Sequence, residues 1–134
     1  MKIDGQCHCG QIAFEAEIDP EKVEICHCAD CQTLSGSAFR VVVPTPDESF
    51  TLLRGAPKTY ERVAESGNRR LQAFCPDCGT PLYSTSANPG ARNITLRVGA
   101  IRQRDQLPPK IQYWVRSAQD WVMEIGKLRR VEKQ

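Results

Sequence analysis

The chain of 134 residues contains no long hydrophobic run and no break in composition. No apolar stretch approaches the roughly 20 residues that a helix needs to cross a bilayer, so we expect no membrane partner. Residues 1–6 lack the apolar segment of a secretion signal, which predicts a cytoplasmic protein. Because no linker or internal repeat divides the chain, the sequence predicts one globular domain over residues 1–134 with a modest core.

Cysteine, by contrast, is abundant, and its seven residues fall into two pairs and a group of three: Cys7 with Cys9, Cys75 with Cys78, and Cys26, Cys28 and Cys31. The odd total speaks against a disulfide framework. A thioredoxin-like dithiol would need a helix where Gly79 and Pro81 break the chain, and a haem site would need a histidine after the second cysteine. Thiolates so closely spaced can converge on one small cation, so the pattern predicts zinc.

The cysteine count favours a division into two different zinc sites. The two pairs, Cys7 with Cys9 and Cys75 with Cys78, supply the four ligands of a closed structural site. The group of three, Cys26, Cys28 and Cys31, leaves one coordination position open for water or substrate, as a catalytic zinc requires. A second grouping stays open at this point, in which Cys28 and Cys31 join Cys75 and Cys78 as a zinc ribbon and Cys7, Cys9 and Cys26 are left over.

The chain also lacks a strong charge of either sign. Its formal net charge is +2, which becomes −1 when seven thiolates and two Zn²⁺ ions are counted. The basic residues between Lys127 and Lys133 form only a local patch, typical of a solvated terminus. We therefore expect no nucleic-acid partner, and nothing in the sequence selects an oligomeric state.

The apolar residues recur mostly with a period of two, which predicts a mainly β fold with little helix. The predicted strands cover residues 12–18, 37–43, 50–54, 59–63, 71–74, 82–84, 93–98 and 111–115. One helical turn is predicted over 30–34 and a short helix over 117–128. We expect Trp114 and Trp121 to pack in the core, although they are also candidates for a pocket wall.

The two histidines lie between cysteines in the Cys-x-Cys segments. On a strand, residues i and i+2 point to one face and the residue between them points away. His8 and His27 are therefore not expected to be zinc ligands, and the preferred interpretation is that both imidazoles face solvent. The alternative for His27 is a role in moving protons at the open zinc site.

Four ordered segments together resemble the glutathione-dependent formaldehyde-activating enzyme family: Cys7-His8-Cys9-Gly10, Cys26-His27-Cys28-Ala29-Asp30-Cys31-Gln32, Ser35-Gly36-Ser37-Ala38-Phe39, and Phe74-Cys75-Pro76-Asp77-Cys78-Gly79-Thr80-Pro81-Leu82. Tyr113-Trp114-Val115-Arg116-Ser117 and Trp121 extend the resemblance, which covers about Gly5 to Trp121. It implies small antiparallel sheets in a tent-like arrangement around zinc, similar to the Mss4-like fold. It also implies a structural zinc on Cys7, Cys9, Cys75 and Cys78, and a catalytic zinc on Cys26, Cys28 and Cys31.

The implied activity is that of a zinc-dependent carbon–sulfur lyase, in which the sulfur of glutathione adds to formaldehyde to give S-hydroxymethylglutathione. The open zinc could remove the proton of the substrate thiol or polarise the aldehyde oxygen, and the sequence does not choose between the two. Glutathione carries two carboxylates, so arginines are candidates for binding it. By residue type alone these are Arg40, Arg69, Arg70 and Arg116, although arginines on strands are more often exposed.

Two other functions stay open on the sequence. One is a noncatalytic zinc-binding interaction module. The other is a related zinc enzyme that acts on another small substrate, because families diversify through their loops while they keep their metal sites.

Overall fold

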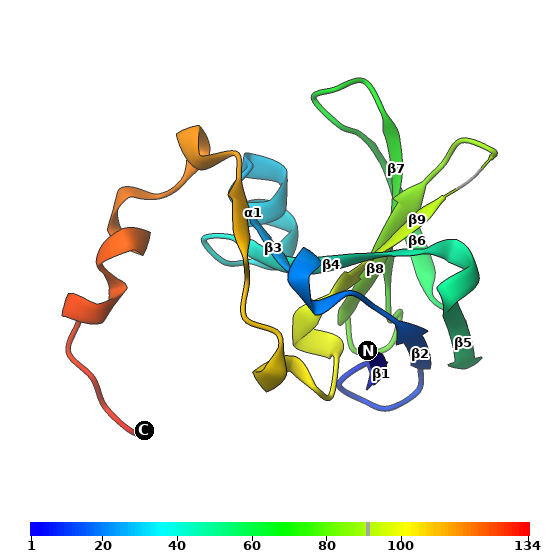
Figure 1. The fold of residues 1–134 in the computed structure, drawn as a ribbon, viewed down its shortest axis with the longest axis horizontal. Helices are drawn as coiled ribbons and strands as arrows, with labels where there is room; N and C mark the ends of the chain where they lie inside the picture. The colour runs from blue at the N-terminus through cyan, green and yellow to red at the C-terminus, as the bar shows by residue number, and fades with distance from the viewer. Residues whose placement is uncertain (91) are drawn as a thin grey trace.

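Two β-sheets make up the body of the molecule in the computed structural model, which describes residues 1–90 and 92–134 (Figure 1). The smaller sheet has the order β1 (Lys2–Gln6), β2 (Ala13–Glu17), β5 (Phe50–Arg54). The larger sheet has the order β10 (Ile111–Tyr113), β3 (Glu24–Cys26), β4 (Arg40–Pro46), β9 (Asn93–Arg97), β8 (Pro81–Ser86), β7 (Arg69–Phe74), β6 (Lys58–Val63). Neighbouring strands are antiparallel, apart from the parallel pair of β10 and β3. The predicted mainly β fold is thus confirmed.

Helical structure is scarce, as predicted. The α-helix α1 (Ala29–Ser35) contains the predicted turn and ends at Gly36, which adopts the left-handed conformation with a φ of 65°. Short 3₁₀ segments account for the rest: η1 (Pro20–Lys22), η2 (Asp47–Ser49), η3 (Val98–Ala100), η4 (Arg104–Gln106), η5 (Val115–Ser117) and η6 (Asp120–Lys127). The helix expected over 117–128 is therefore only this irregular η6, interrupted at Glu124. No helix in the described ranges is both long enough and apolar enough to span a bilayer.

The prediction for β4 is corrected, because the strand continues through Pro44 and ends at Pro46 instead of stopping before them. β3 pairs with β4 only up to Val42, whereas β9 pairs with β4 as far as Pro46. The two prolines therefore lie where β4 has a strand neighbour on one side only, and there a missing N–H is tolerated.

The core lies between the two sheets and ends at one of the cysteine clusters. Ile3 and Phe14 from the smaller sheet and Val43 and Leu96 from the larger sheet belong to one buried hydrophobic cluster, and Cys7 and Cys75 belong to it as well. An isolated β-bridge between Gly5 and Ile101 also joins β1 to the chain that follows β9.

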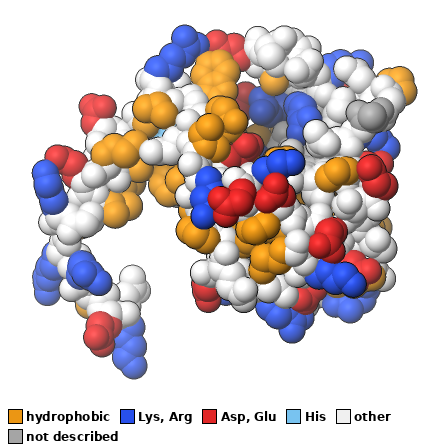
Figure 2. All heavy atoms as spheres, in the orientation of Figure 1, with side chains coloured by type: hydrophobic (Ala, Val, Ile, Leu, Met, Phe, Trp, Pro, Cys, Tyr) orange, Lys and Arg blue, Asp and Glu red, His pale blue; other side chains and the backbone are white. Residues whose placement is uncertain are grey.

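The prediction that the tryptophans are core residues is wrong. Trp114 and Trp121 are 39% and 51% exposed. After Trp114, the orange and red C-terminal segment in Figure 1 runs away from both sheets, and Figure 2 shows apolar side chains along it. The exposed side chains in this segment include Trp121, Met123, Ile125, Leu128 and Val131.

Candidate metal centre and active site

The first cysteine cluster forms where two similar turns meet. Cys7 follows β1, and the backbone N–H of Gly10 donates to the Cys7 carbonyl at 3.0 Å. Cys75 follows β7, and the N–H of Gly79 donates to the Cys75 carbonyl at 2.8 Å. Both glycines have a positive φ, 80° and 76°, which favours glycine because it has no Cβ. Each turn brings two cysteines to the same point.

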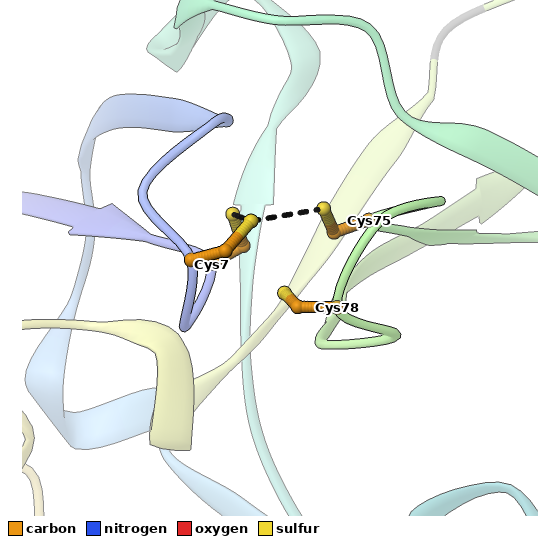
Figure 3. Close-up of side chains that lie close together, drawn as sticks. Cys7, Cys75 and Cys78 are labelled. Carbon is orange, nitrogen blue, oxygen red and sulfur yellow. Dashed lines mark hydrogen bonds between the residues drawn. The ribbon is translucent and has the colours of Figure 1, made fainter.

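The four sulfur atoms of this cluster have the spacing of a tetrahedral metal site. The Sγ atoms of Cys7, Cys9, Cys75 and Cys78 all lie within 4.8 Å of one another. Cys7 Sγ is 3.6 Å from Cys9 Sγ, and Cys9 Sγ is 3.8 Å from Cys75 Sγ. Sulfurs at about 2.3 Å from zinc in a tetrahedron would lie about 3.8 Å apart. Figure 3 shows Cys7, Cys75 and Cys78 pointing toward one another from their two loops. This donor set fits a zinc ion, because it consists of four thiols at the required distances.

Contacts around the sulfurs fix the two turns relative to each other. The backbone N–H of His8 donates to Thr80 Oγ1 at 3.0 Å, which links the first turn to the second. Cys78 Sγ lies 3.2 Å from the same hydroxyl oxygen, and this hydrogen bond lowers the pKa of Cys78 to about 5. The backbone N–H of Ile12 donates to Cys7 Sγ at 3.3 Å. Such contacts favour thiolates, which are the form that binds a metal.

The second cluster contains Cys26, Cys28 and Cys31, whose Sγ atoms also lie within 4.8 Å of one another. Cys26 is the last residue of β3, Cys28 is the N-cap of α1, and Cys31 lies in the first turn of that helix. The N–H of Cys31 donates to Cys28 Sγ at 3.4 Å. The expectation that the Cys-x-Cys segments lie on strands is therefore corrected: Cys7 and Cys9 occupy a turn, and Cys26 and Cys28 straddle the junction between a strand and a helix.

Without a metal, the three thiols of the second cluster share their protons unequally. The hydrogen bond from Cys31 lowers the pKa of Cys26 to about 5, and the same bond raises the pKa of Cys31. The charge of Arg40 lowers the pKa of both thiols. Among the described residues, no histidine, aspartate or glutamate joins the three sulfurs as a fourth donor. A metal ion held here would therefore keep a position that the protein does not fill.

The structure separates the two clusters, so the zinc-ribbon grouping that the sequence left open is not formed. Cys28 and Cys31 come together with Cys26, whereas Cys75 and Cys78 come together with Cys7 and Cys9. The reason is topological: β3 and β7 lie on opposite sides of the β4, β9 and β8 strands.

The two histidines differ, and the prediction of a solvent-facing imidazole is wrong for His27. His8 is exposed, but His27 has no exposed surface. Its Nε2 lies 2.7 Å from Gln112 Oε1, and its ring packs against Phe39 with 5.7 Å between the ring centroids. The side chain therefore connects the second cluster to β10, and neither histidine is among the grouped donor atoms.

A cavity of about 300 Å³ opens at the second cluster, and its wall includes Cys28, Asp30, Arg62 and Trp114. Arg62 forms an ion pair with Asp30 at 2.5 Å. Trp114 adopts a φ of 58°, and the Arg116 guanidinium lies 5.0 Å from its ring centroid. Of the two expectations for Trp114, the structure supports the pocket wall and contradicts the core position.

The four arginines named by residue type have different surroundings. Arg69 and Arg116 are exposed and form ion pairs with Glu61 and Glu65. Arg70 is half-buried, and Arg40 is 6% exposed. Sequence reasoning also missed Arg97, which is 7% exposed. In the alternating strand 93–98, Arg97 occupies a position between apolar residues, and this pattern is typical of a solvent-facing side chain.

A mainly β body with a four-cysteine cluster and a three-cysteine cluster defines a small class of cysteine-rich proteins that can bind metal. Within that class, the chain belongs to the family of glutathione-dependent formaldehyde-activating enzymes, because the family model matches residues 2–117. The resemblance seen in the cysteine segments is thus confirmed.

Individual proteins also resemble the chain. An uncharacterized lyase of Schizosaccharomyces pombe is 31% identical over 85 residues, which make up 63% of this chain and 58% of that protein. The chain therefore matches a little over half the length of this relative. A crystal structure of a Rhodobacter sphaeroides protein is similar with a TM-score of 0.62 at 18% identity, covering 81% of this chain and 98% of that one. This second likeness shows the fold.

Proposed function

We propose that the protein is a zinc-dependent carbon–sulfur lyase that forms or cleaves an adduct between a thiol and an aldehyde. The favoured reaction is the formation of S-hydroxymethylglutathione from glutathione and formaldehyde. Family membership and the S. pombe lyase support this class of reaction. The observation that carries the proposal is the second cluster, which offers three thiolate ligands, no fourth donor among the described residues, and a cavity at Cys28.

The proposed roles divide between the two clusters. Cys7, Cys9, Cys75 and Cys78 would hold a structural zinc, and Cys26, Cys28 and Cys31 a catalytic one. A bound zinc with an open position supplies Lewis acidity, which favours the thiolate form of a substrate thiol. In the overall reaction, the substrate sulfur forms a bond to the aldehyde carbon, the carbonyl π bond breaks, and the oxygen takes up the proton that the thiol loses.

The chain's own residues would shape the site for this reaction. The buried Cys31 and the capping Cys28 fix two sulfurs at the start of α1, and the pairing of β3 with β4 fixes the third. Trp114 and the Arg62 and Asp30 pair form walls that limit the entry of water at Cys28. We expect a cytoplasmic setting, where reducing conditions keep all seven cysteines available as thiolates.

The test joins metal counting with a rate measurement. Native mass spectrometry of the reduced protein should show two zinc ions per chain and a glutathione adduct. Exchange NMR with ¹³C-formaldehyde should show faster formation and cleavage of the adduct than occurs without protein. Cys28→Ser should abolish this acceleration, because it removes one ligand of the open site, while the folded state and one zinc remain.

Exposed His8 provides the matched control, because it also lies beside two cysteines. His8→Ala should retain the full rate and both zinc ions. Full turnover by Cys28→Ser would refute the catalytic role of the second cluster. Two bound zinc ions without any acceleration of thiol–aldehyde exchange would instead favour another small substrate or the noncatalytic binding module.

A further inference from the structure

A second cavity, of about 450 Å³, has buried cations in its wall. Its most buried polar lining residues are Arg40, Gln72 and Arg97, which are 6%, 7% and 7% exposed. Leu34, Phe74 and Pro81 contribute apolar walls. Of the described residues that line this cavity, none is acidic. The cavity thus combines an apolar body with a cationic wall.

The strand registers place these cations on the same face of the larger sheet as the three-cysteine cluster. Cross-strand partners share a face, and so do residues two apart on one strand. Cys26 is the partner of Arg40, and Val42, two residues beyond Arg40, is the partner of Arg97. Arg40 and Arg97 therefore lie on the side of the sheet where Cys26 begins the second cluster.

The two buried guanidiniums share one neutral acceptor. Arg40 Nη1 donates to Gln72 Oε1 at 3.2 Å, and Arg97 Nη2 donates to the same oxygen at 2.7 Å. The Arg97 Nε is buried without a hydrogen-bond partner in the described part of the chain. None of the ion pairs among the described residues includes Arg40 or Arg97. Burial of a charge without a paired anion is unfavourable.

The cysteine cluster accounts for at most one of these two positive charges. Three thiolates with a divalent cation carry a net charge of −1. Arg40, the cross-strand partner of Cys26, lies where it can balance that charge. Arg97 then remains as a surplus cation, and burial together with the charge of Arg40 lowers its pKa to about 9. An anionic group in the cavity would offset this cost and satisfy the unpaired N–H.

We propose that this cavity is a carboxylate-binding subsite, in which Arg40 and Arg97 hold the acid group of an organic substrate whose apolar body lies against Leu34, Phe74 and Pro81. The arginine fork suits a carboxylate because it can donate two parallel hydrogen bonds. The subsite rests on the proposed function, because Arg40 in its wall is the cross-strand partner of Cys26 in the proposed catalytic cluster. It narrows the substrate to carboxylate-bearing molecules and makes uncharged thiol adducts poor ligands.

The test compares a matched pair of probes, 3-phenylpropionate and 3-phenylpropionamide, which differ in charge but hardly in shape. Calorimetry on the zinc-loaded full chain should show at least about tenfold tighter binding of the carboxylate, as charge-assisted hydrogen bonds provide. In Arg97→Gln, the ratio of the two dissociation constants should fall several-fold toward one, because only Arg40 remains to bind the carboxylate. Arg97→Lys, which keeps the charge but not the fork, should give an intermediate ratio.

Arg69→Gln is the control, because Arg69 is an exposed arginine of the same sheet that pairs with Glu61. This variant should keep the wild-type preference. In ¹⁵N spectra, the Arg97 Nε–H resonance should shift with the carboxylate and not with the amide. Equal binding of the two probes would overturn the subsite. An undiminished preference in Arg97→Gln would also overturn it, because the carboxylate would then bind elsewhere, for example on the metal.

The experiment is independent of turnover, so it separates the two proposals. If the protein lacks lyase activity but discriminates between the probes, the subsite is supported and the proposed reaction is refuted. If the protein is an active lyase but binds both probes equally, the proposed reaction is supported and the subsite is refuted.

Discussion

At the scale of single residues, His27 shows how a polar side chain beside proposed metal ligands can serve the fold. It is fully buried, and its Nε2 is hydrogen-bonded to Gln112 Oε1 at 2.7 Å. Its backbone carbonyl accepts a hydrogen bond of 2.8 Å from Gln32, and its N–H donates to the Tyr113 carbonyl at 3.0 Å. These bonds hold the start of α1 against β10 and thereby position the second cluster.

We predict that His27→Phe, which keeps a ring of similar size, lowers the free energy of unfolding by roughly 1–3 kcal/mol through the lost hydrogen bond. Urea denaturation measures this change. His8→Phe is the matched control, because His8 is exposed, and it should change stability by less than about 0.5 kcal/mol. Equal effects of the two substitutions would contradict the structural role of His27.

The sequence predicts which cysteines come together, because close spacing along the chain limits which thiols can reach a common metal ion. The surroundings of the other site residues could not be predicted in this way. Arg97 and His27 are buried by strands that are distant in sequence, and a local pattern does not record such burial. The spacing of Trp114 in a small β domain predicts a core position, yet the residue has a left-handed backbone and lines the cavity beside Cys28.

At the scale of secondary structure, the close packing of β1 positions the first cluster at the core. Gly5 lies in this strand two residues before Cys7. A Cβ atom at Gly5 would lie 2.3 Å from Phe14 Cζ and 2.5 Å from the Ala100 carbonyl oxygen. The strand can therefore pack against β2 and the segment after β9 only with glycine at this position.

We predict that Gly5→Ala destabilises the protein by about 1–3 kcal/mol or more, because the backbone must move away from two contacts at once. Thermal unfolding followed by circular dichroism tests this. The comparison is Gly99→Ala, since a Cβ atom there meets nothing within 4 Å. A Gly5→Ala protein with the stability of Gly99→Ala would refute the close packing of β1.

The eight predicted strands agree well with the structure, since 50–54 matches β5 fully and the others differ by a few residues at their ends. β1 and β3 were missed for physical reasons. β1 has one large apolar residue in the sequence Lys-Ile-Asp-Gly-Gln, and β3 has only three residues. Both strands are stabilised by pairing with neighbours, which a local sequence pattern does not contain.

At the scale of the whole molecule, residues 120–134 are nearly independent of the body. Gln119 Nε2 donates to Gln32 Oε1 at 3.0 Å, whereas the large apolar side chains beyond it are exposed. The family match also ends before this segment, at residue 117.

We predict that removing residues 120–134 leaves zinc content unchanged and alters the free energy of unfolding by less than about 0.5 kcal/mol, because few contacts are lost. Sedimentation velocity should show less self-association than in the full chain, since exposed apolar surface favours it. The full-length double variant Trp121→Ser with Met123→Ser should reproduce this decrease. Unfolding of the shortened chain would show that the segment stabilises the body.

The ligands of the two clusters lie at very different separations along the chain. The two ligand sets are therefore completed at different times during synthesis. The three cysteines of the second cluster have all been synthesised by residue 31, so its ligands are present early. In the first cluster, Cys9 and Cys75 are 66 residues apart. Those thiols can come together only after β7 has been synthesised. A metal ion there would therefore close a long loop late in synthesis and stabilise a fold that is already largely formed.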